Sequence, residues 1–188
     1  YYIYNELGNL NCVIQPKGVE LISPSWVLSD PTILAQQCFR YEYDKRNRMV
    51  IKSVPGAGEV YMVYDAIDRL VMTQDANLRQ SNKWLVSKYD QLNRPFETGL
   101  LTDAGSLVAH FNGAYNSTSY PSTASNYEIL TNIHYDDYAG LPGVFSAGFE
   151  STWNGYFNSN YNSSPNYPQA QVATNQITGF AGWSQTKI

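Results

Sequence analysis

The chain has 188 residues with 12 basic and 16 acidic side chains, which gives a formal net charge of −4 at pH 7. This charge argues against a nucleic-acid-binding protein, because such proteins present a strongly basic surface to the phosphate backbone. No apolar run approaches the roughly 18 residues that a membrane-spanning helix needs. The composition includes 16 tyrosines, 17 asparagines, 13 glycines and 9 prolines, which favours many short strands joined by turns over a helical bundle.

The elements predicted in chain order are mostly strands. Residues 1–4 have the pattern of a strand, and a short helix is predicted after Asp30, where a capping aspartate is followed by proline and by apolar residues at helical spacing. Short aromatic and β-branched runs then alternate with turns, so residues 39–74 are predicted to form an antiparallel meander. Residues 75–83 are predicted to be a longer loop, and further strands follow from residue 84.

One phrase organises the first half of the chain, because it occurs four times. It consists of a tyrosine, an Asp or Asn, two free positions, a Gly, Asn or Asp, then usually an arginine and an apolar residue. The copies occupy residues 2–10, 41–49, 62–70 and 87–95. Repetition of this kind is typical of proteins built from one repeated supersecondary unit.

Each position of the phrase has a physical reason. An Asp or Asn that begins a turn accepts backbone N–H groups two residues further on, and this position holds Asn5, Asp44, Asp65 and Asp90. Three residues later the chain must pass through a left-handed conformation, and this position holds Gly8, Asn47, Asp68 and Asn93. The arginines of the phrase are Arg48, Arg69 and Arg94. We predict that each copy is a hairpin loop made of a turn and a bulge.

The four copies resemble the YD (tyrosine-aspartate) repeats of Rhs-type proteins, a family of bacterial cell-surface and secreted polymorphic toxins and toxin-complex shells. The stretch from Arg40 to Gly99 is similar to the long Rhs proteins of Bacteroidetes. The resemblance implies β-hairpins that stack side by side into a shell, with neighbouring repeats of a parent chain as partners and no cofactor. It also implies that the repeated Tyr, Asp and Arg residues are scaffold residues, with each arginine paired to a neighbouring repeat's Asp or lying on a Tyr ring.

The resemblance divides the chain into two regions. Residues 1–102 are interpreted as a YD-repeat hairpin region, and residues 103–188 as a divergent connector rich in Tyr and Asn. The charge distribution agrees, since residues 1–94 carry a net charge of +1 and residues 95–188 a net charge of −5. We therefore expect a mainly β protein with one or two short helices. Its predicted role is a non-enzymatic structural module of a large cell-surface or secreted Rhs-type protein.

Two other functions are weighed against this one. A carbohydrate-binding or adhesive surface is the first alternative, because aromatic rings among amides and hydroxyls stack on sugar rings. Its candidate residues are Trp153, Tyr156, Tyr161 and Tyr167. A hydrolase or metal site using Asp136 and Asp137 is the second. Adjacent carboxylates on a strand point to opposite faces, which favours a divergent Tyr-Asp turn at this place.

The cysteines and the strand edges complete the predictions. Cys12 and Cys38 permit one disulfide, but the apolar surroundings of Cys38 favour two buried thiols. Terminal hairpins that normally pair with neighbours leave unpaired strand edges in an isolated array. We therefore expect either edge-to-edge self-association or an edge covered by residues 103–188.

Overall fold

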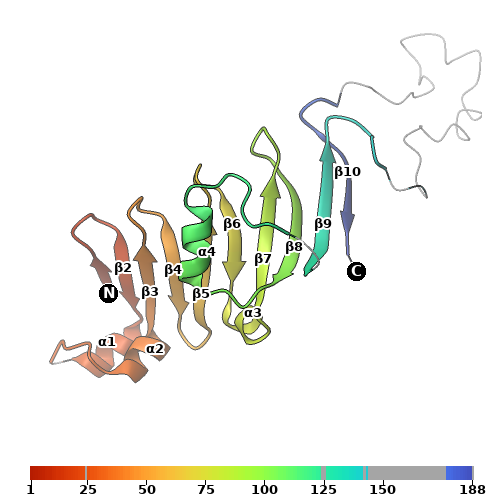
Figure 1. Cartoon of the computed structure of the whole chain (residues 1–188). Helices are drawn as coiled ribbons and strands as arrows, with labels where there is room; N and C mark the ends of the chain where they lie inside the picture. The colour runs from red at the N-terminus through yellow and green to blue at the C-terminus, as the bar shows by residue number, and fades with distance from the viewer. Residues whose placement is uncertain (24, 124–125, 142, 144–176, 188) are drawn as a thin grey trace, which may run out of the picture.

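The computed structural model of the chain describes residues 1–23, 25–123, 126–141, 143 and 177–187. They form one ten-stranded sheet in which the strands follow chain order and every neighbouring pair is antiparallel (Figure 1). The mainly β class and the antiparallel meander are thus confirmed. The strands are β1 Tyr2–Tyr4, β2 Leu10–Ile14, β3 Cys38–Tyr43, β4 Met49–Val54, β5 Gly58–Tyr64, β6 Leu70–Gln74, β7 Lys83–Tyr89, β8 Pro95–Thr102, β9 Tyr127–Tyr135 and β10 Ala181–Thr186.

The four repeat phrases are the short turns of the hairpins β1–β2, β3–β4, β5–β6 and β7–β8. These turns lie side by side along one edge of the sheet, the upper edge in Figure 1. In each hairpin the strand pairing shifts by one residue next to the turn. This shift is the β-bulge that accompanies a turn with a left-handed residue at its end.

The part of the chain that the structure describes holds four short helices in the connections between hairpins, where the sequence predicted one or two: α1 Pro16–Ile22, α2 Pro31–Gln37, α3 Ala76–Gln80 and α4 Leu107–Ala114. The predicted helix after Asp30 is confirmed as α2. Its predicted cap is also present, because the Asp30 carboxylate accepts the Thr32 N–H at 2.7 Å. The prediction of a loop over residues 75–83 was wrong, because Ala76–Gln80 form the helix α3. This helix has a single turn held by Asp75 at its cap, which is too short to show a helical period.

The helices cover one face of the sheet with two separate cores. Directly paired strand residues share a face, and the register places Cys12, Arg40 and Ser53 on the same face as Tyr61 and Val63. Under α1 and α2 the buried residues are Cys12, Ile14, Ile22 and Cys38. The buried residues of the larger core, which includes one residue of α4, are Val63, Val71, Met72, Trp84, Val86, Leu101 and Ala114.

The two cysteines are both buried and free, in agreement with the interpretation as two buried thiols. Burial raises the pKa of the Cys12 thiol to about 11. The thiol therefore stays protonated at neutral pH and behaves as a small apolar core residue. Among the described residues, no helix is long and apolar enough to cross a membrane.

Helix α4 carries a histidine into the larger core. His110 is 3% exposed, and its Nδ1 lies 2.8 Å from the Tyr120 hydroxyl. Its ring meets the buried Trp84 ring edge-on at a centroid distance of 4.6 Å. The Nε2 atom is 3.8 Å from the Asp103 carboxylate, beyond hydrogen-bond range. Burial lowers the pKa of His110, and the opposing effect of Asp103 is smaller.

This environment predicts a stability change at mildly acidic pH. Because the folded protein holds His110 neutral, the unfolded chain binds a proton first as the pH falls below about 6.5. The free energy of unfolding should therefore decrease from this pH downwards, by at most about 1.4 kcal/mol per pH unit, until the lowered pKa of the folded state is reached. Urea denaturation between pH 7 and pH 5 measures the change.

The matched variant is His110→Gln, which keeps a polar group near Tyr120 but does not titrate. Its free energy of unfolding should stay level across this pH interval. An equal decrease in both proteins would place the titrating group elsewhere.

Candidate functional site: the turn ladder

The four turns share one hydrogen-bonding pattern around their first residue. In each turn one side-chain oxygen of the Asp or Asn accepts the backbone N–H groups two and four residues further on. The donor–acceptor distances lie between 2.8 and 3.0 Å. The fourth residue is left-handed in every turn: φ is +80° at Gly8, +59° at Asn47, +67° at Asp68 and +62° at Asn93. The sequence pattern is thus explained by local backbone chemistry.

The second carboxylate oxygen binds the arginine of the same turn. The Nε atoms of Arg48, Arg69 and Arg94 each donate to the aspartate four residues earlier at 2.7 Å. Burial alone raises the pKa of Asp44, but hydrogen bonds from Arg48 and from two backbone N–H groups outweigh it and leave the pKa lowered. In the first turn Asn5 and Asn9 replace this ion pair with two neutral amides.

The guanidinium groups also reach forward to the next turn. Arg48 donates to the Asp68 carboxylate at 2.7 Å, and Arg69 donates to the Asn93 side-chain oxygen at 3.1 Å. In the first turn the Asn9 amide donates to Asn47 at 3.1 Å. In every case the donor is the fifth residue of one turn and the acceptor is the left-handed residue of the next. We call this row of contacts the turn ladder.

The tyrosines that precede the turns, together with Tyr135 at the end of β9, also form contacts between neighbouring hairpins. The guanidinium carbons of Arg48, Arg69 and Arg94 lie 5.0, 5.2 and 4.3 Å from the ring centres of Tyr64, Tyr89 and Tyr135, each in the following hairpin. The hydroxyl groups of three of these tyrosines donate in the opposite direction, to the backbone carbonyl of the residue that follows the preceding turn, with an oxygen–oxygen distance of 2.9 Å. These bonds join Tyr43 to Leu10, Tyr89 to Leu70 and Tyr135 to Pro95. The Tyr64 hydroxyl instead faces the Met62 sulfur at 3.8 Å.

A fifth turn extends the row of contacts beyond residue 102, but here the arginine of the preceding turn binds the first residue, Asp136, and the fourth residue is Gly179. Asp136 follows β9 with φ at +72°, and the backbone N–H of Gly179, 43 positions later, donates to its carboxylate at 2.6 Å. Arg94 binds the same carboxylate through two nitrogens, at 2.6 and 3.0 Å. The hydrogen bond from Arg94 has the largest effect on the pKa of Asp136 and that from Gly179 the second largest, and the pKa is lowered to about 2. The sequence predicted a divergent Tyr-Asp turn at Asp136. It did not identify Arg94 and Gly179 as the partners of this carboxylate, because both lie more than forty positions away in the chain.

The two carboxylates of the alternative hydrolase or metal site, Asp136 and Asp137, do not converge. Asp136 lies after the strand and is held by Arg94, while Asp137 is exposed and lies 2.5 Å from His134 Nε2. The His134 ring in turn stacks on Trp183. The two carboxylates therefore have separate partners. Among the described residues, no group of three or more His, Cys, Asp or Glu side chains is placed to hold a metal ion.

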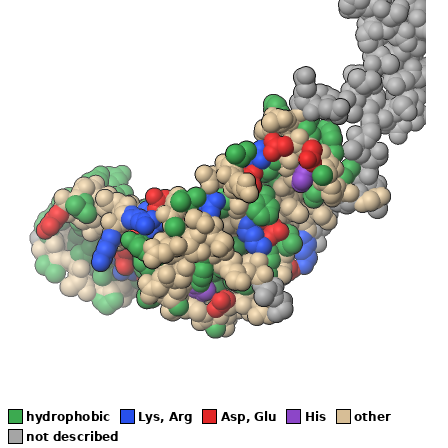
Figure 2. All heavy atoms as spheres, turned by 45° about the horizontal axis from the view of Figure 1, so that its top comes forward, with side chains coloured by type: hydrophobic (Ala, Val, Ile, Leu, Met, Phe, Trp, Pro, Cys, Tyr) green, Lys and Arg blue, Asp and Glu red, His purple; other side chains and the backbone are tan. Residues whose placement is uncertain are grey.

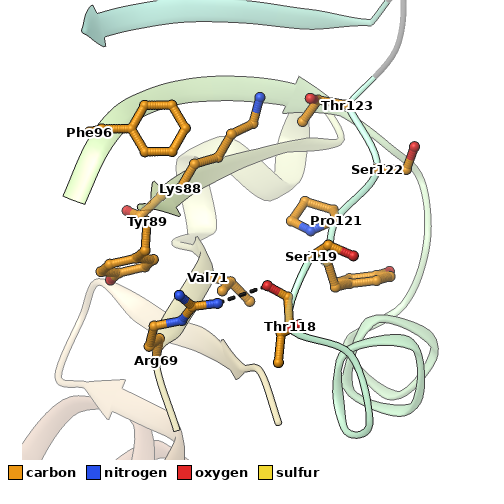
Figure 3. A pocket seen from close by; sticks show the side chains of 12 residues that line it. Arg69, Val71, Lys88, Tyr89, Phe96, Thr118, Ser119, Pro121, Ser122 and Thr123 are labelled. Atoms are coloured by element: carbon orange, nitrogen blue, oxygen red, sulfur yellow. Dashed lines mark hydrogen bonds between the residues drawn. The ribbon is translucent and has the colours of Figure 1, made fainter. Parts of the chain in front are cut away.

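A cavity of about 340 Å³ lies between the ladder and the segment that follows α4 (Figure 3). Arg69 and Lys88 point toward it together with hydroxyl groups of residues 118–123. Both cations already have carboxylate partners, because Arg69 and Lys88 each lie 2.7 Å from one, that of Asp65 and that of Glu97. The cavity therefore offers no unpaired positive charge to an anionic ligand. Figure 2 shows that basic and acidic side chains are interspersed along the visible face of the molecule.

The candidate sugar-binding residues Trp153, Tyr156, Tyr161 and Tyr167 lie outside the described residues. Carbohydrate binding therefore stays a prediction from the sequence.

The fold and the ladder define a mainly β protein of hairpins joined turn to turn. No protein-family model and no curated protein matches the chain. One solved structure that is similar is described as "Crystal Structure of TcdB2-TccC3-TEV", with 15% sequence identity and a TM-score of 0.44. The alignment covers 71% of this chain and 5% of that chain, so the present chain spans a small part of its length.

The burial of the third turn predicts which aspartate matters most for stability. The Asp65 side chain is 0% exposed and its partner Arg69 is 14% exposed. Asp65→Ala leaves Arg69 without its carboxylate and two N–H groups without their acceptor. It should lower the free energy of unfolding by about 3–5 kcal/mol, as measured by guanidinium denaturation.

Asp90→Ala is the matched control. Its carboxylate has the same bonds but is 24% exposed, so water replaces part of the contact and the loss should be smaller. Equal losses in both variants would show that burial does not decide the strength of these pairs.

Proposed function

We propose that this chain is a non-catalytic structural module, a stretch of hairpin wall in a larger cell-surface or secreted protein of the Rhs/YD-repeat type. The observation that carries the proposal is the turn ladder, in which an arginine or asparagine of each turn binds the next turn. The assignment to the Rhs type rests on the four Tyr-Asp phrases of the sequence. The cell-surface or secreted location is part of the same proposal.

The ladder explains why the repeated residues fit a scaffold better than an active site. A general acid or base must exchange protons near the working pH and must reach a substrate. The Asp65 carboxylate is fully buried in a salt bridge with Arg69. The pKa of Asp136 is lowered to about 2, chiefly by hydrogen bonds from Arg94, so this carboxylate stays ionised. The most regular polar residues of the chain are therefore engaged in holding turns together.

The repetition itself supports a wall. In an array whose units contact only their neighbours, stability is the sum of the unit terms and the terms between neighbours. Here each boundary between hairpins carries strand pairing at one end and a side-chain link at the turn end. Single exposed ion pairs contribute little, but the arginines are partly buried and make several bonds each. Such an array is extended in one direction and can be lengthened by further hairpins.

The proposal predicts that damage to one turn spreads to the next. Arg69→Ala removes the bond to Asp65 in its own turn and the bond to Asn93 in the following turn. Amide hydrogen exchange should therefore become faster in residues 65–69 and also in residues 90–94. Mass-spectrometric exchange on the whole chain measures both segments at once.

The control is Lys45→Ala, which removes an exposed cation from the second turn and should leave exchange in both segments unchanged. Faster exchange confined to residues 65–69 would show independent turns and contradict a coupled wall. A hydrolytic activity that is lost in Asp137→Ala would contradict the non-catalytic role. A reading frame that encodes no further Tyr-Asp copies beside this chain would contradict the assignment to a larger array.

A further inference from the structure

The boundary between the first and second hairpins lacks the arginine that joins the later turns. At the next three boundaries an arginine of one turn donates to the following turn. Here the side-chain link between the turns is neutral, because the Asn9 amide donates to the Asn47 side chain at 3.1 Å. Strand pairing at this boundary joins residues 12–14 of β2 to residues 38–40 of β3. The first turn is therefore attached to the second without an ionic link.

Both cysteines lie at this boundary, on the same face of the sheet. Cys12 pairs with Arg40 and Ile14 pairs with Cys38, so the two cysteines are diagonal neighbours on adjacent strands. They belong to the core under α1 and α2, where Cys12 is 8% exposed and Cys38 is 1% exposed. Burial has the largest effect in raising the pKa of Cys12, and the charge of Cys38 and its hydrogen bond to Cys12 raise it further. This hydrogen bond places the two thiols next to each other.

A bond between the two sulfur atoms needs a small movement of the chain, and the start of β3 allows it. Diagonal neighbours of an antiparallel pair lie roughly 7–8 Å apart, whereas the Cα atoms of a relaxed disulfide lie about 6 Å apart. Cys38 is the first residue of β3 and the C-cap of α2, and β4 pairs with β3 only from Arg40 onwards. Cys38 can therefore move toward Cys12 without breaking a pair with β4.

We propose that Cys12 and Cys38 form a reversible disulfide that joins the first hairpin to the second, and that the oxidant is a small disulfide of the glutathione type. The covalent link stands at the boundary where no arginine joins the turns. The inference goes beyond the proposed function, but the use of the bond rests on the cell-surface or secreted location proposed there, since disulfides persist in oxidising compartments. Strain from the diagonal position makes the bond readily reducible.

The reaction consists of two thiol–disulfide exchanges. The Cys12 thiolate attacks one sulfur of oxidised glutathione, whose S–S bond breaks and releases one glutathione thiolate. The Cys38 thiolate then attacks the Cys12 sulfur, which forms the bond between the two cysteines and releases the second glutathione. The two protein thiols together lose two protons and two electrons, which reduce oxidised glutathione to two thiols. Cys12 reacts first because it is the more exposed of the two.

The test incubates the whole folded chain with oxidised glutathione, blocks the remaining thiols by alkylation and analyses tryptic peptides without reduction. Peptides 1–17 and 18–40 should appear joined, and dithiothreitol should separate them. Because the Cys12 thiol is protonated at neutral pH, the rate should rise about tenfold between pH 7 and pH 8. A rate that does not change with pH would contradict attack by the Cys12 thiolate.

Three products overturn the inference. These are glutathione that stays on Cys12, a bond between two chains, and two free thiols both in the folded chain and after refolding from urea with the same oxidant. Cys38→Ala should stop the reaction at the glutathione adduct of Cys12. Cys12→Ala should leave Cys38 unreacted, and an adduct on Cys38 would contradict the order of attack.

The effect of the bond is measured by amide hydrogen exchange in the oxidised and reduced chains. Exchange in β1 and β2 should become severalfold slower on oxidation, while residues 90–94 of the fourth turn serve as the internal control and stay unchanged. Unchanged exchange in β1 and β2 with the bond formed would show that it does not hold the first hairpin. The coupling of residues 65–69 to residues 90–94 is measured without the thiols, so failure of the disulfide and failure of the proposed function are distinguishable.

Discussion

The structure depends on the arginine at the end of a turn, which binds both its own turn and the next one. In the second turn, the Nε of Arg48 donates to Asp44, which closes the same turn, and its Nη1 donates to Asp68, the left-handed residue of the next turn. A single side chain thereby fixes the conformation of one loop and its distance from the next. Because the left-handed position must be Gly, Asn or Asp for steric reasons, it also supplies an acceptor whenever it is Asn or Asp. Local backbone chemistry and contact between hairpins are thus satisfied by the same residues.

This arrangement gives the sheet a direction. Donors point from each turn toward later hairpins, and tyrosine hydroxyls point back toward earlier ones. The helices α1 and α4 each contribute buried residues to one of the two cores. At the turn edge the segment after α4 reinforces the third turn, through the Ser117 and Thr118 carbonyls that accept from Ala66 and Arg69. The third turn is therefore tied both to the fourth turn and to the segment after α4.

The sequence was sufficient for the parts of the fold that are local. A turn is closed between residues at most four apart, so Asp44, Asn47 and Arg48 could be assigned their places without knowing the fold. Links between turns could not be assigned one by one, because they depend on strand register over about twenty or more residues. The Tyr-Asp turn at Asp136 was predicted, but its closure by Gly179 was missed for the same reason, since the two residues are far apart in the chain. α3 was missed because one helical turn has no period to detect.

The central claim is that neighbouring turns are energetically coupled, and a double-mutant cycle between Arg94 and Asp136 tests it most directly. Arg94→Ala and Asp136→Asn are measured singly and together by denaturant unfolding. The Asp136→Asn change keeps a side-chain oxygen that can accept the Gly179 N–H. The bond from Arg94 to Asp90 is lost in both variants that carry Arg94→Ala, so its loss cancels in the cycle. If the turns are coupled, the double variant should lose markedly less free energy of unfolding than the sum of the losses in the two single variants. Additive losses would show that the contact between Arg94 and Asp136 does not join the fourth hairpin to the fifth.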